Sequence, residues 1–206
     1  MYRILQTQFT PIWNRESRVI MTNCACMPVS STSLLVLWSL TAVFLVVLNC
    51  FGSQLSPAKP LDTTFPRTAN STLALVDSYG DAGRFWYKSY ELFDVLLFIA
   101  TYGAALYLSF QALAPDRIGG ILRGLVLVTV VADFLEDGAA VALCLTTDKG
   151  DDASSTRYLL ATISVVATAT KFAGFTICFL AVVVLAVGRR LSGSGYEALP
   201  AKSSAT

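Results

Sequence analysis

The sequence predicts an all-α polytopic membrane protein, built as an antiparallel four-helix transmembrane bundle. The 206-residue chain is 54% hydrophobic and only 14% charged, whereas about 25% of residues are charged in a typical soluble domain. Its mean hydropathy is +0.60. Four apolar stretches match the length of roughly 20 residues that a helix needs to cross a bilayer. They cover about residues 34–51, 92–113, 122–145 and 158–187.

The first stretch, about 34–51, follows a predicted cytoplasmic tail of residues 1–32. A cleaved signal peptide is the alternative, and it would leave three spans. However, more than 30 residues precede the apolar run, and the run is longer than the usual 7–15 residues of a signal peptide. We therefore expect a first span, a transmembrane domain over residues 33–190 and a second tail over residues 191–206.

The first loop, about residues 52–90, begins with the proline-rich and polar stretch "SQLSPAKPLDTTFP", which is typical of irregular chain. Its second half predicts a short helix that ends near Gly80. Four aromatic residues then precede the second span, as in the aromatic belt at a membrane surface. They are Phe85, Trp86, Tyr87 and Tyr90.

The second loop, "LAPDRIGG", is short enough to make the second and third spans an antiparallel hairpin. The basic residues predict how the chain is oriented in the membrane, because lysines and arginines concentrate on the cytoplasmic side. The first loop contains Asn70-Ser71-Thr72, a glycosylation acceptor, and the third loop is acidic, "TDKGDDASS". We therefore expect both termini in the cytoplasm and Asn70 on the lumenal or extracellular side. The basic residues are Arg3, Arg15, Arg18, Arg117, Arg123, Arg189 and Arg190.

The chain contains no histidine, which excludes histidine-ligated haem, histidine zinc sites and a Ser-His-Asp triad. We expect no cofactor and no metal site. Cys24 and Cys26 lie just before the first span, where S-palmitoylation is plausible. Cys50 and Cys144 fall near the outer ends of their spans, so a disulfide between them is a further prediction.

Three acids interrupt the third span in the stretch "ADFLEDGAA". Asp133, Glu136 and Asp137 are spaced i, i+3 and i+4 and therefore share one helix face. A charged side chain at the bilayer centre costs about 2.5–3.5 kcal/mol on insertion scales. The acidic face should therefore look into the bundle.

Folding the spans as hairpins indicates which residues meet this face. A turn near residue 151 places Lys171 level with Asp133, and Tyr102 falls near the same depth. A turn near residue 116 places Asp94 close to Glu136 and Asp137. We predict a buried polar cluster in which Asp133 pairs with Lys171 and at least one acid is protonated. Its members are Asp94, Tyr102, Asp133, Glu136, Asp137 and Lys171.

The motif "DFLED" at Asp133 to Asp137 resembles the D-[FL]-L-E-[ND] motif of a group of uncharacterised small four-span membrane proteins. That group also has a lysine in the fourth span, as Lys171 here, and an aspartate early in the second, as Asp94 here. The resemblance covers roughly residues 73–189. Asp137 departs from the more usual asparagine and adds a third acid. The resemblance implies the four-span topology and the polar cluster, and it implies no activity.

The carboxy-terminal tail contains "GYEAL", which resembles tyrosine-based endosomal and lysosomal sorting signals through Tyr196 and Leu199. We therefore expect the protein in the plasma membrane or in an endosomal or lysosomal membrane. A chance match is the alternative.

Two classes of function fit these features. The first is a non-enzymatic bundle that has a structural role or binds protein partners, and it is the leading expectation. Homo- or hetero-oligomers would form through small-residue faces such as Ala100/Ala104 and Thr170/Gly174. The alternative is a proton- or cation-coupled transporter or a small-ligand-binding protein that uses the polar cluster. An enzyme acting on lipids ranks third, because no nucleophile motif accompanies the acids. The bilayer is the expected surrounding, and no nucleic-acid partner is expected.

Overall fold

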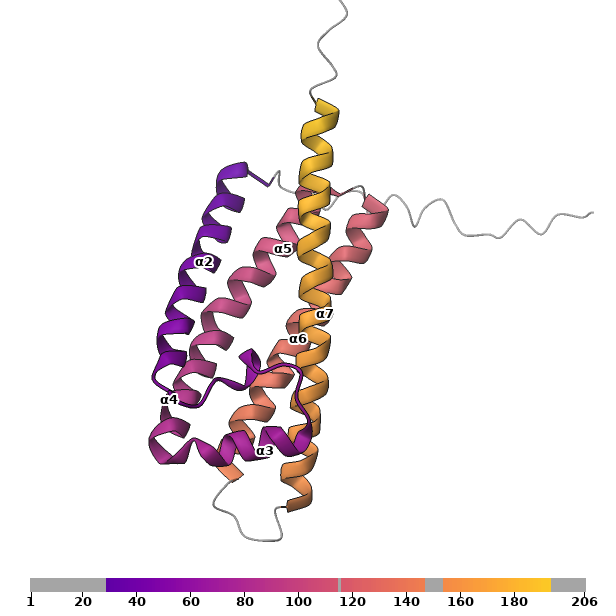
Figure 1. The fold of residues 1–206 in the computed structure, drawn as a ribbon. Coiled ribbons are helices and arrows are strands. Elements are labelled where there is room, and N and C mark those ends of the chain that lie inside the picture. Colours follow the sequence, from indigo (N-terminus) through magenta and orange to yellow (C-terminus); the bar gives the residue numbers. More distant parts are fainter. Residues whose placement is uncertain (1–28, 115, 147–153, 194–206) are drawn as a thin grey trace, which may run out of the picture.

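A computed structural model describes residues 29–114, 116–146 and 154–193. These residues form an all-α bundle (Figure 1), and four of its helices are long and apolar enough to cross a membrane. The predicted all-α fold class is therefore confirmed, and four candidate membrane-spanning helices cover the four apolar stretches. Cys24, Cys26, Tyr196 and Leu199 lie outside the described residues.

The first span is α2 (Ser31–Ser53). Ser30 caps its amino-terminal end, and the Ser30 side chain accepts a hydrogen bond from the Ser33 backbone N–H. Ser30 thereby satisfies one of the backbone donors that a helix start leaves free. The helix packs mainly against α5 and α4. Trp38 Nε1 donates to Ser109 Oγ on α5 at 3.2 Å. Most other side chains of α2 face outward, as expected for a lipid-facing helix.

The second span is a continuous helical rod made of α4 (Gly80–Phe93), a π-helical turn η2 (Asp94–Phe98) and α5 (Ile99–Leu113). This rod begins at Gly80, before the start of the predicted span near residue 92. Hydropathy marks only the apolar part of a helix, whose backbone hydrogen bonds continue into polar sequence. Tyr87 and Tyr90 are buried, so only Phe85 and Trp86 are exposed as a membrane-surface belt would require.

The third and fourth spans are α6 (Asp116–Thr146) and α7 (Ser154–Gly193), which pack side by side along much of their length. Gly174 makes this approach possible, because a Cβ atom there would lie 2.1 Å from Thr129 Oγ1 of α6. Gly174 therefore packs within the chain. The predicted partner face at Thr170/Gly174 keeps only Thr170 exposed.

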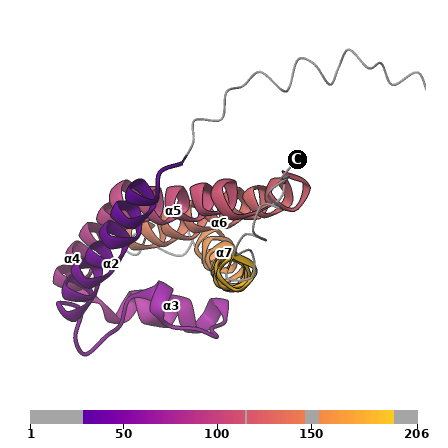
Figure 2. The same cartoon turned by 90° about the horizontal axis from the view of Figure 1, so that it is seen from above.

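The first loop covers one end and one side of the bundle. It contains the short 3-10 helix η1 (Leu61–Thr63) and the helix α3 (Ala69–Ser78), which ends where the sequence predicts. Figures 1 and 2 show α3 lying across the long helices beside α7. Gly80 has φ +60°, a left-handed conformation that glycine adopts without strain. This turn connects α3 to α4.

Candidate functional site

Three of the predicted cluster residues meet in the middle of the bundle. Lys171 Nζ of α7 lies 2.5 Å from Asp133 Oδ1 of α6. The Tyr102 hydroxyl of α5 donates to Asp133 Oδ2 at 2.6 Å. Asp133 is 2% exposed and Lys171 13% exposed in their side chains. The three helices thus hold one carboxylate between an ammonium group and a phenol.

Glu136, one turn along α6, lies between two basic groups. Lys171 Nζ is 2.8 Å from its Oε2 atom, and Arg67 Nη2 is 2.9 Å from its Oε1 atom. Arg67 Nη2 also lies 2.7 Å from the hydroxyl oxygens of Ser164 and Thr168 on α7. The Thr168 hydroxyl donates to Glu136 as well. Both oxygens of this carboxylate are therefore neutralised by charge-assisted contacts.

Arg67 was missed by sequence reasoning. It comes from the first loop, yet it is 9% exposed, and its other guanidinium nitrogen donates to the Leu61 backbone carbonyl. The one available signal was that the predicted spans contain more acidic than basic residues. Buried carboxylates need positive partners, so a further basic side chain from outside the spans was to be expected. That signal does not select Arg67 over Lys59, Arg84 or Lys88, which lie in the same predicted loop.

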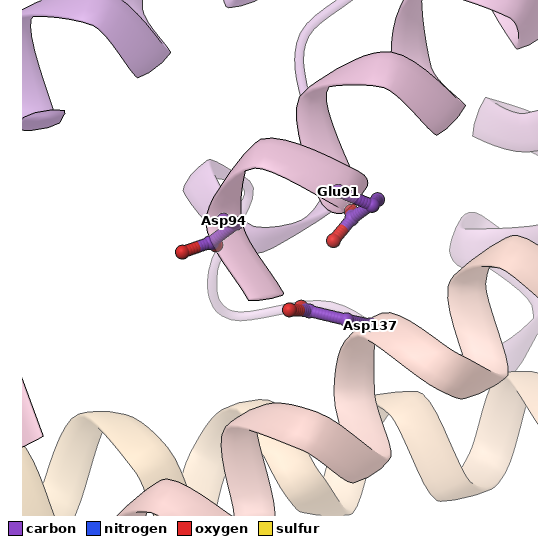
Figure 3. A group of neighbouring side chains, drawn as sticks. All are labelled: Glu91, Asp94 and Asp137. Carbon is purple, nitrogen blue, oxygen red and sulfur yellow. The ribbon is translucent and has the colours of Figure 1, made fainter. Parts of the chain in front are cut away.

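A second group of acids lies beside the first. Carboxylate oxygens of Glu91, Asp94 and Asp137 all come within 4.8 Å of one another. Figure 3 shows Glu91 and Asp94 on the α4–η2 rod and Asp137 facing them from α6. Sequence reasoning placed Asp94 near Glu136 and Asp137 but left Glu91 out of the cluster. The structure divides the acids differently, because Glu136 turns to Lys171 and Arg67 while Asp137 turns to Glu91.

The first loop adds a further acid, Asp62, whose carboxylate accepts a hydrogen bond from the Tyr90 hydroxyl. Burial raises the pKa of Asp62 above its usual value, an effect partly offset by the charge of Lys171 and by the Tyr90 hydrogen bond. The Asp62 Oδ1 atom is buried without a hydrogen-bond partner. Six buried or half-buried carboxyl groups thus face two basic side chains, Arg67 and Lys171.

A cavity of about 650 Å³ reaches this cluster between α2, α7 and the first loop. Most of the exposed wall is apolar, and polar residues of α2, the first loop, the second span, α6 and α7 also line it. Phe65 of the loop contacts Phe172 of α7, with ring centroids 5.4 Å apart. The lining comprises Leu45, Leu48, Asn49, Gly52, Ser53, Pro60, Asp62, Thr63, Tyr90, Asp94, Phe98, Tyr102, Asp133, Lys171, Phe172 and Phe175.

The predicted disulfide does not form in the structure, where Cys50 and Cys144 are free thiols. Cys50 is exposed on α2 and Cys144 is buried on α6. The physical reason is that α2 packs against α5 and α4, so the two cysteines belong to helices that are not packing partners. Asn70 is exposed on α3, and its glycosylation stays a prediction.

No family model matches the chain, and no curated protein or solved structure is significantly similar to it. Its resemblance to the four-span group with the D-[FL]-L-E-[ND] motif therefore stays a prediction.

Proposed function

We propose that this protein is a non-enzymatic integral membrane protein that binds a small amphiphile with a cationic head in the cavity beside Lys171 and Asp62. The observation that carries the proposal is the cavity itself, because a volume of about 650 Å³ falls within the range of roughly 300–1,000 Å³ that is typical of ligand pockets. A network that serves only to fix helix packing needs no such space. The geometry therefore favours the ligand-binding alternative over the structural or partner-binding role.

The lining supports an amphiphilic ligand. Leu45 and Leu48 of α2 line the cavity together with Phe172 and Phe175 of α7, and these side chains suit a hydrocarbon chain. Leu45 is half-exposed at the surface of the bundle. A ligand dissolved in the bilayer would therefore reach the cavity from the side, between α2 and α7.

The charge of the lining supports a cationic head. Lys171 is the one basic residue in the lining, and Asp133 and Glu136 already engage it. Asp62 keeps an unpartnered buried oxygen. An ammonium head placed beside Asp62 would stabilise the ionised form of this carboxyl, which burial disfavours.

The test uses the full chain in phosphatidylcholine nanodiscs and three probes with equal chains: dodecylamine, dodecanol and dodecanoate. Thermal unfolding is measured with each probe. A ligand at 100 times its Kd stabilises a protein by about 2.7 kcal/mol. We expect dodecylamine to raise the Tm most and dodecanoate to leave it unchanged.

Two variants of α2 provide the control. Leu45→Trp fills the cavity and should abolish the response, whereas Val46→Trp changes a lipid-facing residue (63% exposed) and should keep it. Asp62→Asn should remove the advantage of dodecylamine over dodecanol. Equal responses in the two tryptophan variants would refute binding in this cavity, and equal responses to all three probes would reduce the effect to partitioning into the membrane.

We further propose that both termini are cytoplasmic, which places the first loop and Asn70 in the lumen or outside the cell. The arginines that flank the spans and the acidic third loop support this orientation.

The sorting pattern at Tyr196 and Leu199 supports a plasma or endosomal/lysosomal membrane. For oligomers, Ala100 remains exposed on α5 and supports assembly through the Ala100/Ala104 face.

A further inference from the structure

The three acids in Figure 3 converge from two helices. Glu91 is on α4 and Asp94 begins the π-helical turn η2, so the two residues lie one helical turn apart on the same face. Asp137 approaches that face from α6. A single π turn inserted in an α-helix is frequently found at functional sites. Here it begins at Asp94, the residue that belongs both to the acidic group and to the cavity wall.

These acids lack the basic partners that Asp133 and Glu136 have. Glu91 and Asp137 are 1% exposed and Asp94 is 2% exposed. Both oxygens of Glu91, both oxygens of Asp137 and Oδ1 of Asp94 make no hydrogen bond of good geometry. Burying an ionised carboxylate without a partner is among the most costly arrangements in a protein.

An independent side chain points to the same place. Tyr87 of α4 is fully buried, and its hydroxyl also has no hydrogen-bond partner of good geometry. It lies close enough to Glu91 for the two groups to interact. Tyr87 thus places a buried hydroxyl without a partner of good geometry beside the three carboxylates.

Arg67 and Lys171 do not fill this role, because Arg67 contacts Glu136 and Lys171 contacts Asp133 and Glu136. We propose that Glu91, Asp94 and Asp137 bind one hard divalent cation, of the class of Mg²⁺, Ca²⁺ and Mn²⁺. The group offers carboxylate oxygens alone, the ligands that hard cations prefer over nitrogen and sulfur. This proposal departs from the expectation, drawn from the sequence, of no metal site.

The cation site is independent of the proposed amphiphile. Glu91 and Asp137 are not in the cavity lining, and Asp94 alone belongs to both. A cation held by these three acids would neutralise Asp94, the one member of the group that also lines the cavity. Dodecylamine binding and cation binding can therefore succeed or fail separately.

The test uses the full chain in nanodiscs, stripped with EDTA and titrated with Mn²⁺, with free Mn²⁺ followed by electron paramagnetic resonance. We expect one Mn²⁺ per chain in the wild type, displaced by Mg²⁺ or Ca²⁺. Asp137→Asn and Glu91→Gln should each weaken binding at least tenfold. Asp81→Asn is the matched control, because Asp81 is also on α4 but is 96% exposed in its side chain, and it should bind like the wild type.

Thermal unfolding distinguishes a variant that has lost the cation site from one that no longer folds. In EDTA, Asp137→Asn should have a higher Tm than the wild type, since it removes an uncompensated buried acid. Added Mn²⁺ should raise the Tm of the wild type and of Asp81→Asn but not that of Asp137→Asn. Absence of bound Mn²⁺ in the wild type would overturn the proposal, as would equal binding by the wild type and Asp137→Asn, whether or not dodecylamine binds.

Discussion

Replacing Lys171 by methionine tests how the two acids of α6 share their basic partners. Removing one member of a buried ion pair typically costs about 3–5 kcal/mol. Asp133 is 2% exposed, so water replaces the lost ammonium group only in part. It can instead take up a proton, which limits the loss. For a carboxyl that ordinarily titrates near pH 4, at 1.36 kcal/mol per pH unit, proton uptake costs about 4 kcal/mol at pH 7 and about 1.5 kcal/mol at pH 5.

We therefore expect Lys171→Met to lower the free energy of unfolding by about 3–4 kcal/mol at pH 7 and by about half of that or less at pH 5. The assay is equilibrium unfolding in maltoside micelles by addition of dodecyl sulfate, followed by tryptophan fluorescence. A loss of the same size at both pH values would show that no buried acid had been left unpaired.

A second replacement identifies which acid is stranded. Glu136 keeps Arg67 as a partner when Lys171 is lost, whereas Asp133 keeps only the hydroxyl of Tyr102. Asp133→Asn should therefore recover most of the stability lost in Lys171→Met. Glu136→Gln should recover little, because it leaves Arg67 without its carboxylate. Better recovery by Glu136→Gln would refute this division of partners.

Three further predictions follow from packing, from titration and from topology. Gly174→Ala should destabilise the bundle by about 1–3 kcal/mol through its clash with Thr129, while Gly188→Ala on the same helix, where nothing lies within 4 Å, should be neutral in the same unfolding assay. Because burial raises the pKa of Asp62 in the folded state, its protonated form is favoured there, so its contribution to stability is full at low pH and is lost as the pH rises above 3.8 through the raised value. Asp62→Asn should therefore gain stability over the wild type at pH 8 and less at pH 5; an equal difference at both values would contradict this. Asn70→Gln should remove a mass shift sensitive to endoglycosidase when the chain is made in a eukaryotic secretory membrane, and a wild type without that shift would count against the lumenal loop.

The outline of the fold follows from local properties of the sequence. Whether a stretch can cross a bilayer depends on its own length and hydropathy, so four helices could be counted without knowing how they pack. Likewise, the 3.6-residue period alone places Asp133, Glu136 and Asp137 on one face. The cost of burying charge in a membrane then directs that face inward, toward the lysine at matching depth on the neighbouring helix.

The division of the acids is decided by tertiary structure. Arg67 reaches Glu136 because the first loop returns to α6 and α7 just before α3 begins, and no periodic pattern records the path of an irregular loop. Glu91 joins Asp137 because α4 continues straight into the second span through η2. The cavity exists because α2 leans on α5 and α4 and makes little contact with α7. Each of these features depends on contacts between residues distant in sequence, which helix length, hydropathy and period do not encode.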